Sequence, residues 1–119
     1  MKKKILIIED DDDILKITTA ILNHSNFEVA GISGTNDIIE SVKVHGPDLI
    51  LTDYMLPGLS GGQIATIIKV NAATSHIPVI LMSAYDKKAI AIGNFNYDAY
   101  VKKPFHIDHL VKVIKRYIN

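Results

Sequence analysis

The sequence predicts a doubly wound α/β domain, in which helices cover both faces of a five-stranded parallel sheet. Short apolar runs alternate five times with segments whose apolar residues recur at helical spacing. Three of the runs are continuously apolar, as expected of central strands that are buried on both faces. This alternation is typical of βαβ units with right-handed crossovers, which build one parallel sheet.

Five apolar runs predict the strands, and they are Ile5–Ile8, Phe27–Ile32, Leu49–Leu51, Val79–Met82 and Ala99–Val101. The first, third and fourth are the continuous ones. In a sheet of this kind, ligands bind beyond the carboxyl ends of the strands, where the strand order reverses. We therefore expect functional residues in the short stretches that follow the strands.

Four of the five helices are predicted from apolar residues that recur every three or four positions. The sets are Ile14, Ile17 and Ile21; Ile38, Ile39 and Val42; Ile64, Ile67 and Ile68; and Ile107, Leu110, Val111, Ile114 and Ile118. An apolar stripe of this kind normally faces the core. The fourth helix in chain order, near Lys87–Ile92, is expected to be short.

Length and composition indicate one domain, residues 1–119, in the cytoplasm. Hydrophobic residues make up 48% of the 119, enough to bury a core without disulfides. The absence of cysteine excludes thiol catalysis, Cys-ligated zinc and a secreted disulfide framework. No apolar run approaches the roughly 20 residues that cross a bilayer. The run behind the basic start is also too short for a signal peptide.

Charge is balanced over the chain but uneven along it. Thirteen basic and thirteen acidic residues cancel, whereas a duplex-binding domain shows a basic excess. We therefore expect no direct contact with nucleic acid. Five acids form one run, Glu9 to Asp13. We interpret Asp12 and Asp13 as a solvated helix start, because acids favour the positive end of a helix; Asp11 remains open.

The first two acids of this run, together with a third acid later in the chain, predict a metal site. Glu9 and Asp10 end the first strand, and Asp53 ends the third, its expected neighbour. Acids in one pocket repel each other, and Mg²⁺, which takes oxygen ligands, relieves that repulsion. A carboxylate can also act as a nucleophile and form an aspartyl phosphate. The transferring phosphoryl group then needs a cation and a hydrogen-bond donor, which Lys103 and Ser83 can supply.

Four segments resemble the motifs of receiver domains in two-component signalling systems. They are Lys4–Asp11, Pro47–Gly58, Ile77–Ala84 and Tyr100–Phe105. The resemblance spans the whole chain, and the motifs follow in the family's order with nearly its spacing. The chain is similar to the single-domain chemotaxis regulator of this family. The resemblance implies a flavodoxin-like fold with the strand order 2-1-3-4-5.

The resemblance also implies roles for individual residues at the metal. Asp53 resembles the phosphoacceptor, and Asp10 resembles the acid that ligates Mg²⁺ directly. Glu9 resembles the acid that holds the ion through water. The backbone carbonyl of Met55 is the third protein ligand by the same comparison.

Other matched residues are implied in phosphoryl binding and switching. Ser83 resembles the hydroxyl that bonds one phosphoryl oxygen, and Lys103 resembles the lysine that pairs with another. Tyr100 resembles the aromatic residue whose rotation reports the phosphorylated state. The bond before Pro104 is often cis in this family, and a cis bond before proline costs little.

The function implied is that of a phosphoacceptor. A sensor histidine kinase or a histidine phosphotransfer protein transfers a phosphoryl group to Asp53, and the domain catalyses only its own phosphorylation and dephosphorylation. The fourth helix, fifth strand and fifth helix then form a switched face for a downstream protein. His109 and Val113 stand where DNA-binding members of the family carry an acid and an arginine for dimerisation. We therefore expect a monomer.

The sequence departs from the family pattern at several positions. Glu9 replaces the commoner aspartate and Ser83 the commoner threonine, and both keep the required oxygen. The interval from Ser83 to Lys103 is shorter than usual, so the fourth helix is expected to be trimmed. Asn96 stands where glycine usually follows that helix, and asparagine tolerates the left-handed backbone expected there.

Two other functions remain as alternatives. The first is a degenerate receiver that acts as a phosphorylation-independent interaction module, which loss of Asp10, Asp53 or Lys103 would signal; all three are present. The second is a Mg²⁺-dependent phosphohydrolase, because Asp10 and Asp12 flank one residue after a strand, as in the haloacid-dehalogenase family. That family needs further motifs and usually a cap domain, for which 119 residues leave no room.

Overall fold

A computed structural model describes residues 2–119 and contains one parallel sheet with the strand order β2-β1-β3-β4-β5. The strands are β1 (Lys4–Ile8), β2 (Glu28–Ile32), β3 (Leu49–Asp53), β4 (Val79–Ser83) and β5 (Ala99–Lys102). The predicted doubly wound α/β fold and its strand order are confirmed. The order reverses at β1, which lies between β2 and β3.

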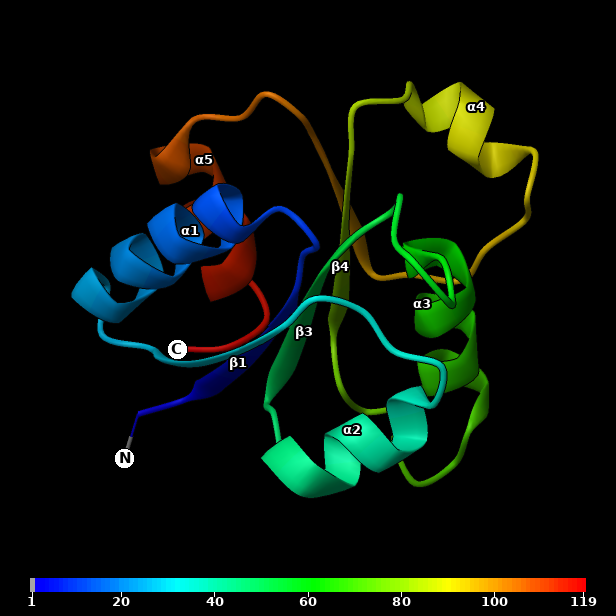
Figure 1. Cartoon of the computed structure of the whole chain (residues 1–119), viewed down its shortest axis with the longest axis horizontal. Coiled ribbons are helices and arrows are strands. Elements are labelled where there is room, and N and C mark those ends of the chain that lie inside the picture. Colours follow the sequence, from blue (N-terminus) through cyan, green and yellow to red (C-terminus); the bar gives the residue numbers. More distant parts are fainter. Residues whose placement is uncertain (1) are drawn as a thin grey trace.

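A helix follows each strand (Figure 1). They are α1 (Asp12–His24), α2 (Ile38–His45), α3 (Gly61–Val70), α4 (Lys87–Ala91) and α5 (Ile107–Lys115). Helices α1 and α5 lie side by side on one face of the sheet, and α2 and α3 lie on the other. The fourth helix is short, as expected. None of the helices in residues 2–119 has both the length and the apolar character needed to cross a membrane.

Alternate residues of the central strands pack into opposite layers. Ile5 and Ile7 of β1 pack in the layer of α1 and α5, whereas Leu6 and Ile8 pack in the layer of α2 and α3. All four are at most 1% exposed. Full burial of such a side chain contributes about 1.5–3 kcal/mol. Because both faces are covered, the strand must be continuously apolar, and this explains the pattern in the sequence.

Helix α1 buries a different stripe from the one predicted. Ile14 and Ile17, which we expected to face the sheet, are 37% and 61% exposed. The side chains that pack toward the sheet are Leu15, Thr18 and Leu22. This helix carries two apolar stripes, and only one of them can face the core. The prediction of a helix is confirmed, and the prediction of its buried face is wrong.

The structure also decides two points about helix ends. Asp11, left open above, is the N-cap of α1, where its carboxylate accepts a hydrogen bond from the amide of Ile14 at 3.1 Å. The left-handed residue after α4 is Asn94, with φ of 52°, and Asn96 does not have a positive φ. The short helix ends at Ala91 and the chain turns soon afterwards, before Asn96 is reached. The peptide bond between Lys103 and Pro104 is cis.

Candidate functional site

The strand register brings the predicted site residues to one edge of the sheet. Ile8 pairs with Thr52, Asp53 with Met82, and Ser83 with Lys102. The amide of Glu9 donates to the carbonyl of Ile32, which places Glu9 just beyond β1. The residues that follow β1, β3, β4 and β5 therefore converge beside the point where the strand order reverses.

Three acids form a cluster at this edge. One carboxylate oxygen from each of Glu9, Asp10 and Asp53 lies within 4.8 Å of the others. Glu9 is 1% exposed and Asp53 is 9% exposed, whereas Asp10 faces solvent. In residues 2–119, none of the five histidines joins a group of this kind. Carboxylate oxygens suit a hard divalent cation, so the donor set fits Mg²⁺.

Lys103 lies between two of these acids. Its Nζ donates to Glu9 Oε1 at 2.9 Å and lies 3.2 Å from Asp53 Oδ1. Burial opposes the charge on Lys103, but the hydrogen bond to Glu9 and the charges of both acids outweigh it and raise the pKa. Burial also raises the pKa of Glu9, against the hydrogen bond from Lys103. One cation thus holds two partly desolvated acids together.

The two oxygens of Asp53 have different surroundings. Oδ1 accepts a hydrogen bond from the amide of Tyr54 at 3.1 Å and faces Lys103. The amide of Tyr54 and the Nζ of Lys103 both contact Oδ1. Within residues 2–119, no donor contacts the other oxygen, Oδ2. One oxygen is held by the protein, and the other is left available for chemistry.

Gly61 allows the start of α3 to pack closely against the backbone of Asp53. A Cβ atom on Gly61 would lie 2.1 Å from the carbonyl oxygen of Asp53, so only glycine fits there. Gly61 and Gly62 are the first residues of α3, which is capped by a reciprocal pair of hydrogen bonds between Ser60 and Gln63.

Ser83 and Tyr100 meet at the loop between β4 and α4. Ser83 is 2% exposed, and its Oγ accepts a hydrogen bond from the amide of Tyr85 at 2.9 Å. A hydroxyl that accepts in this way keeps its own proton free to donate. The hydroxyl of Tyr100, on a half-buried ring, donates to the carbonyl of Tyr85.

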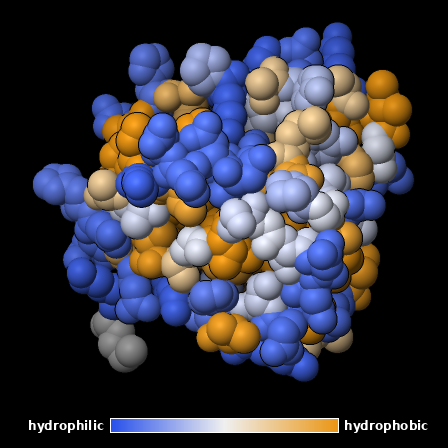
Figure 2. Space-filling view, viewed as in Figure 1, coloured by the Kyte–Doolittle hydropathy of each residue, from blue (hydrophilic) through white to orange (hydrophobic). Residues whose placement is uncertain are grey.

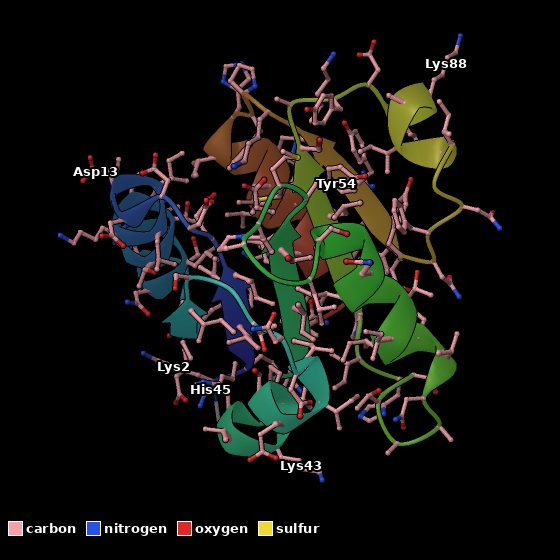
Figure 3. All side chains as sticks on the ribbon, turned by 45° about the vertical axis from the view of Figure 1, so that its right-hand side comes forward. Lys2, Asp13, Lys43, His45, Tyr54 and Lys88 are labelled. Atoms are coloured by element: carbon pink, nitrogen blue, oxygen red, sulfur yellow. The ribbon has the colours of Figure 1, made fainter. Side chains whose placement is uncertain are left out.

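Tyr54, directly after Asp53, belongs to an aromatic cluster that we did not predict. The ring of Tyr54 is labelled in Figure 3. It packs edge-on against Tyr85 and Phe95, with centroid separations of 6.1 and 5.7 Å. A hollow of about 300 Å³ beside it is lined by Tyr54, Met55, Tyr85, Ala89 and Ile90. Met55, whose side chain is 59% exposed, lies at this rim. In the sequence, the only feature that points to a role for Tyr54 is its position directly after Asp53.

Comparison with known proteins agrees with this architecture. Residues 5–115 match the response regulator receiver domain family. The polar-differentiation response regulator DivK of Brucella ovis is 30% identical over 123 residues, which cover 100% of this chain and 98% of DivK.

Two solved structures illustrate the structural likeness. A response regulator receiver domain protein from Clostridium thermocellum is 28% identical with a TM-score of 0.81, covering 98% of this chain and 94% of that one. The receiver domain of a sensor histidine kinase from Pseudomonas aeruginosa, solved with a magnesium ion in its active-site cleft, is 24% identical with a TM-score of 0.81. That match covers 99% of this chain and 98% of the other. The chain described here therefore belongs to the response regulator receiver domain family of two-component signal transduction.

Proposed function

We propose that this domain accepts a phosphoryl group on Asp53, in a Mg²⁺-dependent reaction, from a histidine kinase or a histidine phosphotransfer protein in the cytoplasm. The observation that carries the proposal is the cluster of Glu9, Asp10 and Asp53 with Lys103 between two of its members. A cluster of three acids and one lysine beyond strand ends suits charge neutralisation around a phosphoryl group better than it suits a structural role.

The transfer needs little chemistry beyond positioning. Asp53 Oδ2, the oxygen without a protein donor, forms the new P–O bond as the P–N bond to the donor imidazole breaks. The imidazole nitrogen keeps the bonding electron pair. Tyr54 and Lys103 hold Oδ1 and so fix the direction from which Oδ2 attacks.

Four residues would hold the metal. Asp10, Asp53 and the carbonyl of Met55 would bind Mg²⁺ directly, and Glu9 would bind it through water. When bound, Mg²⁺ neutralises charge on the phosphoryl oxygens and on the attacking carboxylate. The magnesium ion reported in the receiver domain from Pseudomonas aeruginosa supports this choice of metal.

Two side chains would bind the transferred group. Lys103 would exchange its contact with Asp53 Oδ1 for a phosphoryl oxygen, and it remains protonated because its pKa is raised. Ser83 would donate its free hydroxyl proton to another phosphoryl oxygen. The site thereby loses one ion pair and gains two charge-assisted contacts.

An apolar surface beside the site suits a protein phosphodonor. A hollow of about 390 Å³ is lined by Ile14, Ala84, Lys103, Pro104 and Phe105. Ile17, which is 61% exposed, lies three residues after Ile14 on α1, so the two share one face of the helix. Figure 2 shows hydrophobic residues (orange) among hydrophilic ones (blue) where Figure 1 places α1. Exposed apolar residues that adjoin a reactive group favour a docked protein over a small phosphodonor alone.

The Ile17→Asp variant tests this docking surface. It should slow transfer from a phosphorylated histidine phosphotransfer protein by about tenfold or more, because a buried charge opposes docking. Labelling by acetyl phosphate, which needs no docking surface, should stay unchanged. Val44→Asp is the matched control, since Val44 on α2 is 68% exposed and lies on the other face of the sheet. Equal rates of protein-donor transfer in Ile17→Asp and wild type would refute the assignment.

Output would follow from a change of packing at Ser83 and Tyr100. When Ser83 bonds the phosphoryl group, the inward position of Tyr100 becomes more favourable, and the face of α4, β5 and α5 changes for a downstream protein. The domain would signal through that partner and remain without sustained turnover of small phosphate esters.

The direct test of the proposed function is labelling of the wild-type chain. Incubation with acetyl phosphate and Mg²⁺ should add the mass of one phosphoryl group, and base should remove it. Chelation of Mg²⁺ should abolish the gain. An unchanged mass in a folded sample with Mg²⁺ would instead support the phosphorylation-independent interaction module.

A further inference from the structure

Two neighbouring side chains of β5 hold the loop that joins β4 to α4. Tyr100 donates its hydroxyl to the carbonyl of Tyr85, and Lys102 donates its Nζ to Asp86 Oδ1 at 2.5 Å. Residues two apart on a strand point to the same face. Two side chains on one face of β5 therefore hydrogen-bond to two successive residues of the loop, Tyr85 and Asp86.

The same loop contacts the phosphoryl-binding residue proposed above. The amide of Tyr85 donates to Ser83 Oγ, so the position of the loop and the position of that hydroxyl are connected. A group that fixes Asp86 also restricts Tyr85, the residue directly before it in the chain. The contact between Lys102 and Asp86 therefore acts on the packing of Tyr100 through one residue of backbone.

Asp86 gives up a local interaction to make this contact. It occupies the N-cap position of α4, where an aspartate normally accepts a hydrogen bond from the first turn of the helix. Its side chain makes no such bond here and accepts from Lys102 instead. That hydrogen bond lowers the pKa of Asp86 and raises the pKa of Lys102, so both stay charged around neutral pH. An unused cap on a short helix indicates that the ion pair outcompetes it.

We propose that Lys102 and Asp86 are positioning residues, which hold the β4–α4 loop so that the inward position of Tyr100 is populated before any phosphoryl group arrives. Inward here means the position in which the hydroxyl binds the carbonyl of Tyr85. The proposal rests on the proposed function for its regulatory meaning. A phosphoryl group shifts such an equilibrium only by its differential contacts, so the ion pair sets the starting population on which phosphorylation acts.

The test measures the Tyr100 ring in the unphosphorylated chain. Tyrosines are replaced by 3-fluorotyrosine, and the fluorine NMR signal of Tyr100 is assigned with Tyr100→Phe. Lys102→Met should lower the ratio of inward to outward ring by about two- to fivefold, the range expected for an exposed ion pair. Lys88→Met on α4 is the control, because Lys88 points away from the domain (Figure 3) and should leave the ratio unchanged.

Two further arms separate an electrostatic effect from a packing effect. The charge swap Asp86→Lys with Lys102→Asp should restore the wild-type ratio. High salt should move the wild-type ratio toward that of Lys102→Met, because exposed pairs are screened. An unchanged ratio in folded Lys102→Met, or the same loss in Lys88→Met, would overturn the proposal.

Failure of this proposal is distinguishable from failure of the proposed function. Beryllofluoride with Mg²⁺ should move the ring of Lys102→Met back to the inward position, if Asp53 and Ser83 act as proposed. If beryllofluoride changes no tyrosine signal while Lys102→Met still differs from wild type, the positioning role stands and the phosphorylation-driven switch fails.

Discussion

The Asp53→Asn variant is expected to lose phosphorylation completely. Asparagine keeps the shape of the side chain, and its amide oxygen can still accept the hydrogen bond that Tyr54 donates to Asp53 in wild type. Its neutral amide cannot form the new P–O bond. The amide oxygen carries no negative charge and is a much weaker nucleophile than a carboxylate oxygen. Intact-mass measurement after incubation with acetyl phosphate and Mg²⁺ should show no labelled species.

A matched variant tests whether the loss is specific. Asp48 immediately precedes β3, at the end of the strand opposite to Asp53, and Asp48→Asn makes the same chemical change there. It should label like wild type. Stoichiometric labelling of Asp53→Asn would mean that another residue is the phosphoacceptor, and the proposed role of Asp53 would be wrong.

Removal of Asp10 is expected to weaken Mg²⁺ binding more than removal of Glu9. Asp10 faces solvent and is free to ligate the ion, whereas Glu9 is buried and already bonded to Lys103. Loss of an outer partner costs about 10- to 100-fold in affinity, and loss of a direct ligand should exceed that. Calorimetric titration of Asp10→Ala and Glu9→Gln checks the order. Equal affinities would contradict the division of roles.

The two variants should also differ in stability without metal. Asp10→Ala removes one of three clustered negative charges and leaves the ion pairs of Lys103 intact, so the free energy of unfolding should rise slightly in chelator. Thermal unfolding in chelator measures this. A clear loss of stability in Asp10→Ala would show that the acid has a structural partner.

Glu9 should make stability depend on pH in the opposite sense to an ordinary surface acid. Burial raises its pKa above 4.5, so its contribution to stability is complete below pH 4.5 and is lost as the pH rises through the higher folded-state value. Glu9→Gln removes this dependence. Its free energy of unfolding relative to wild type should therefore increase from about pH 4 to about pH 7 in chelator.

The sequence by itself determined that the chain forms a parallel sheet. It also determined that the clustered acids lie at the carboxyl ends of the strands. Continuous apolar runs require strands covered on both faces, and parallel strands bring their carboxyl ends to one edge. Glu9, Asp10 and Asp53 directly follow or end such runs, so their convergence was predictable from the sequence alone. The order of the motifs also sufficed to predict the family.

The tertiary structure decided which faces and which partners those residues have. Ile14 and Ile17 form as good an apolar stripe as Leu15 and Leu22, and only the fit against the sheet selects the second. Spacing along one helix cannot express that choice, because burial depends on the shape of the neighbouring layer.

The same reason applies to charges and hydrogen bonds between distant segments. Lys103 binds Glu9, 94 positions away. Lys102 binds the carboxylate of Asp86, which makes no capping hydrogen bond to its own helix. Sequence patterns describe neighbours within one segment, whereas these partners lie in segments that are far apart in the chain. The partner that wins is set by distances across the folded sheet, and those exist only once the strands are in register.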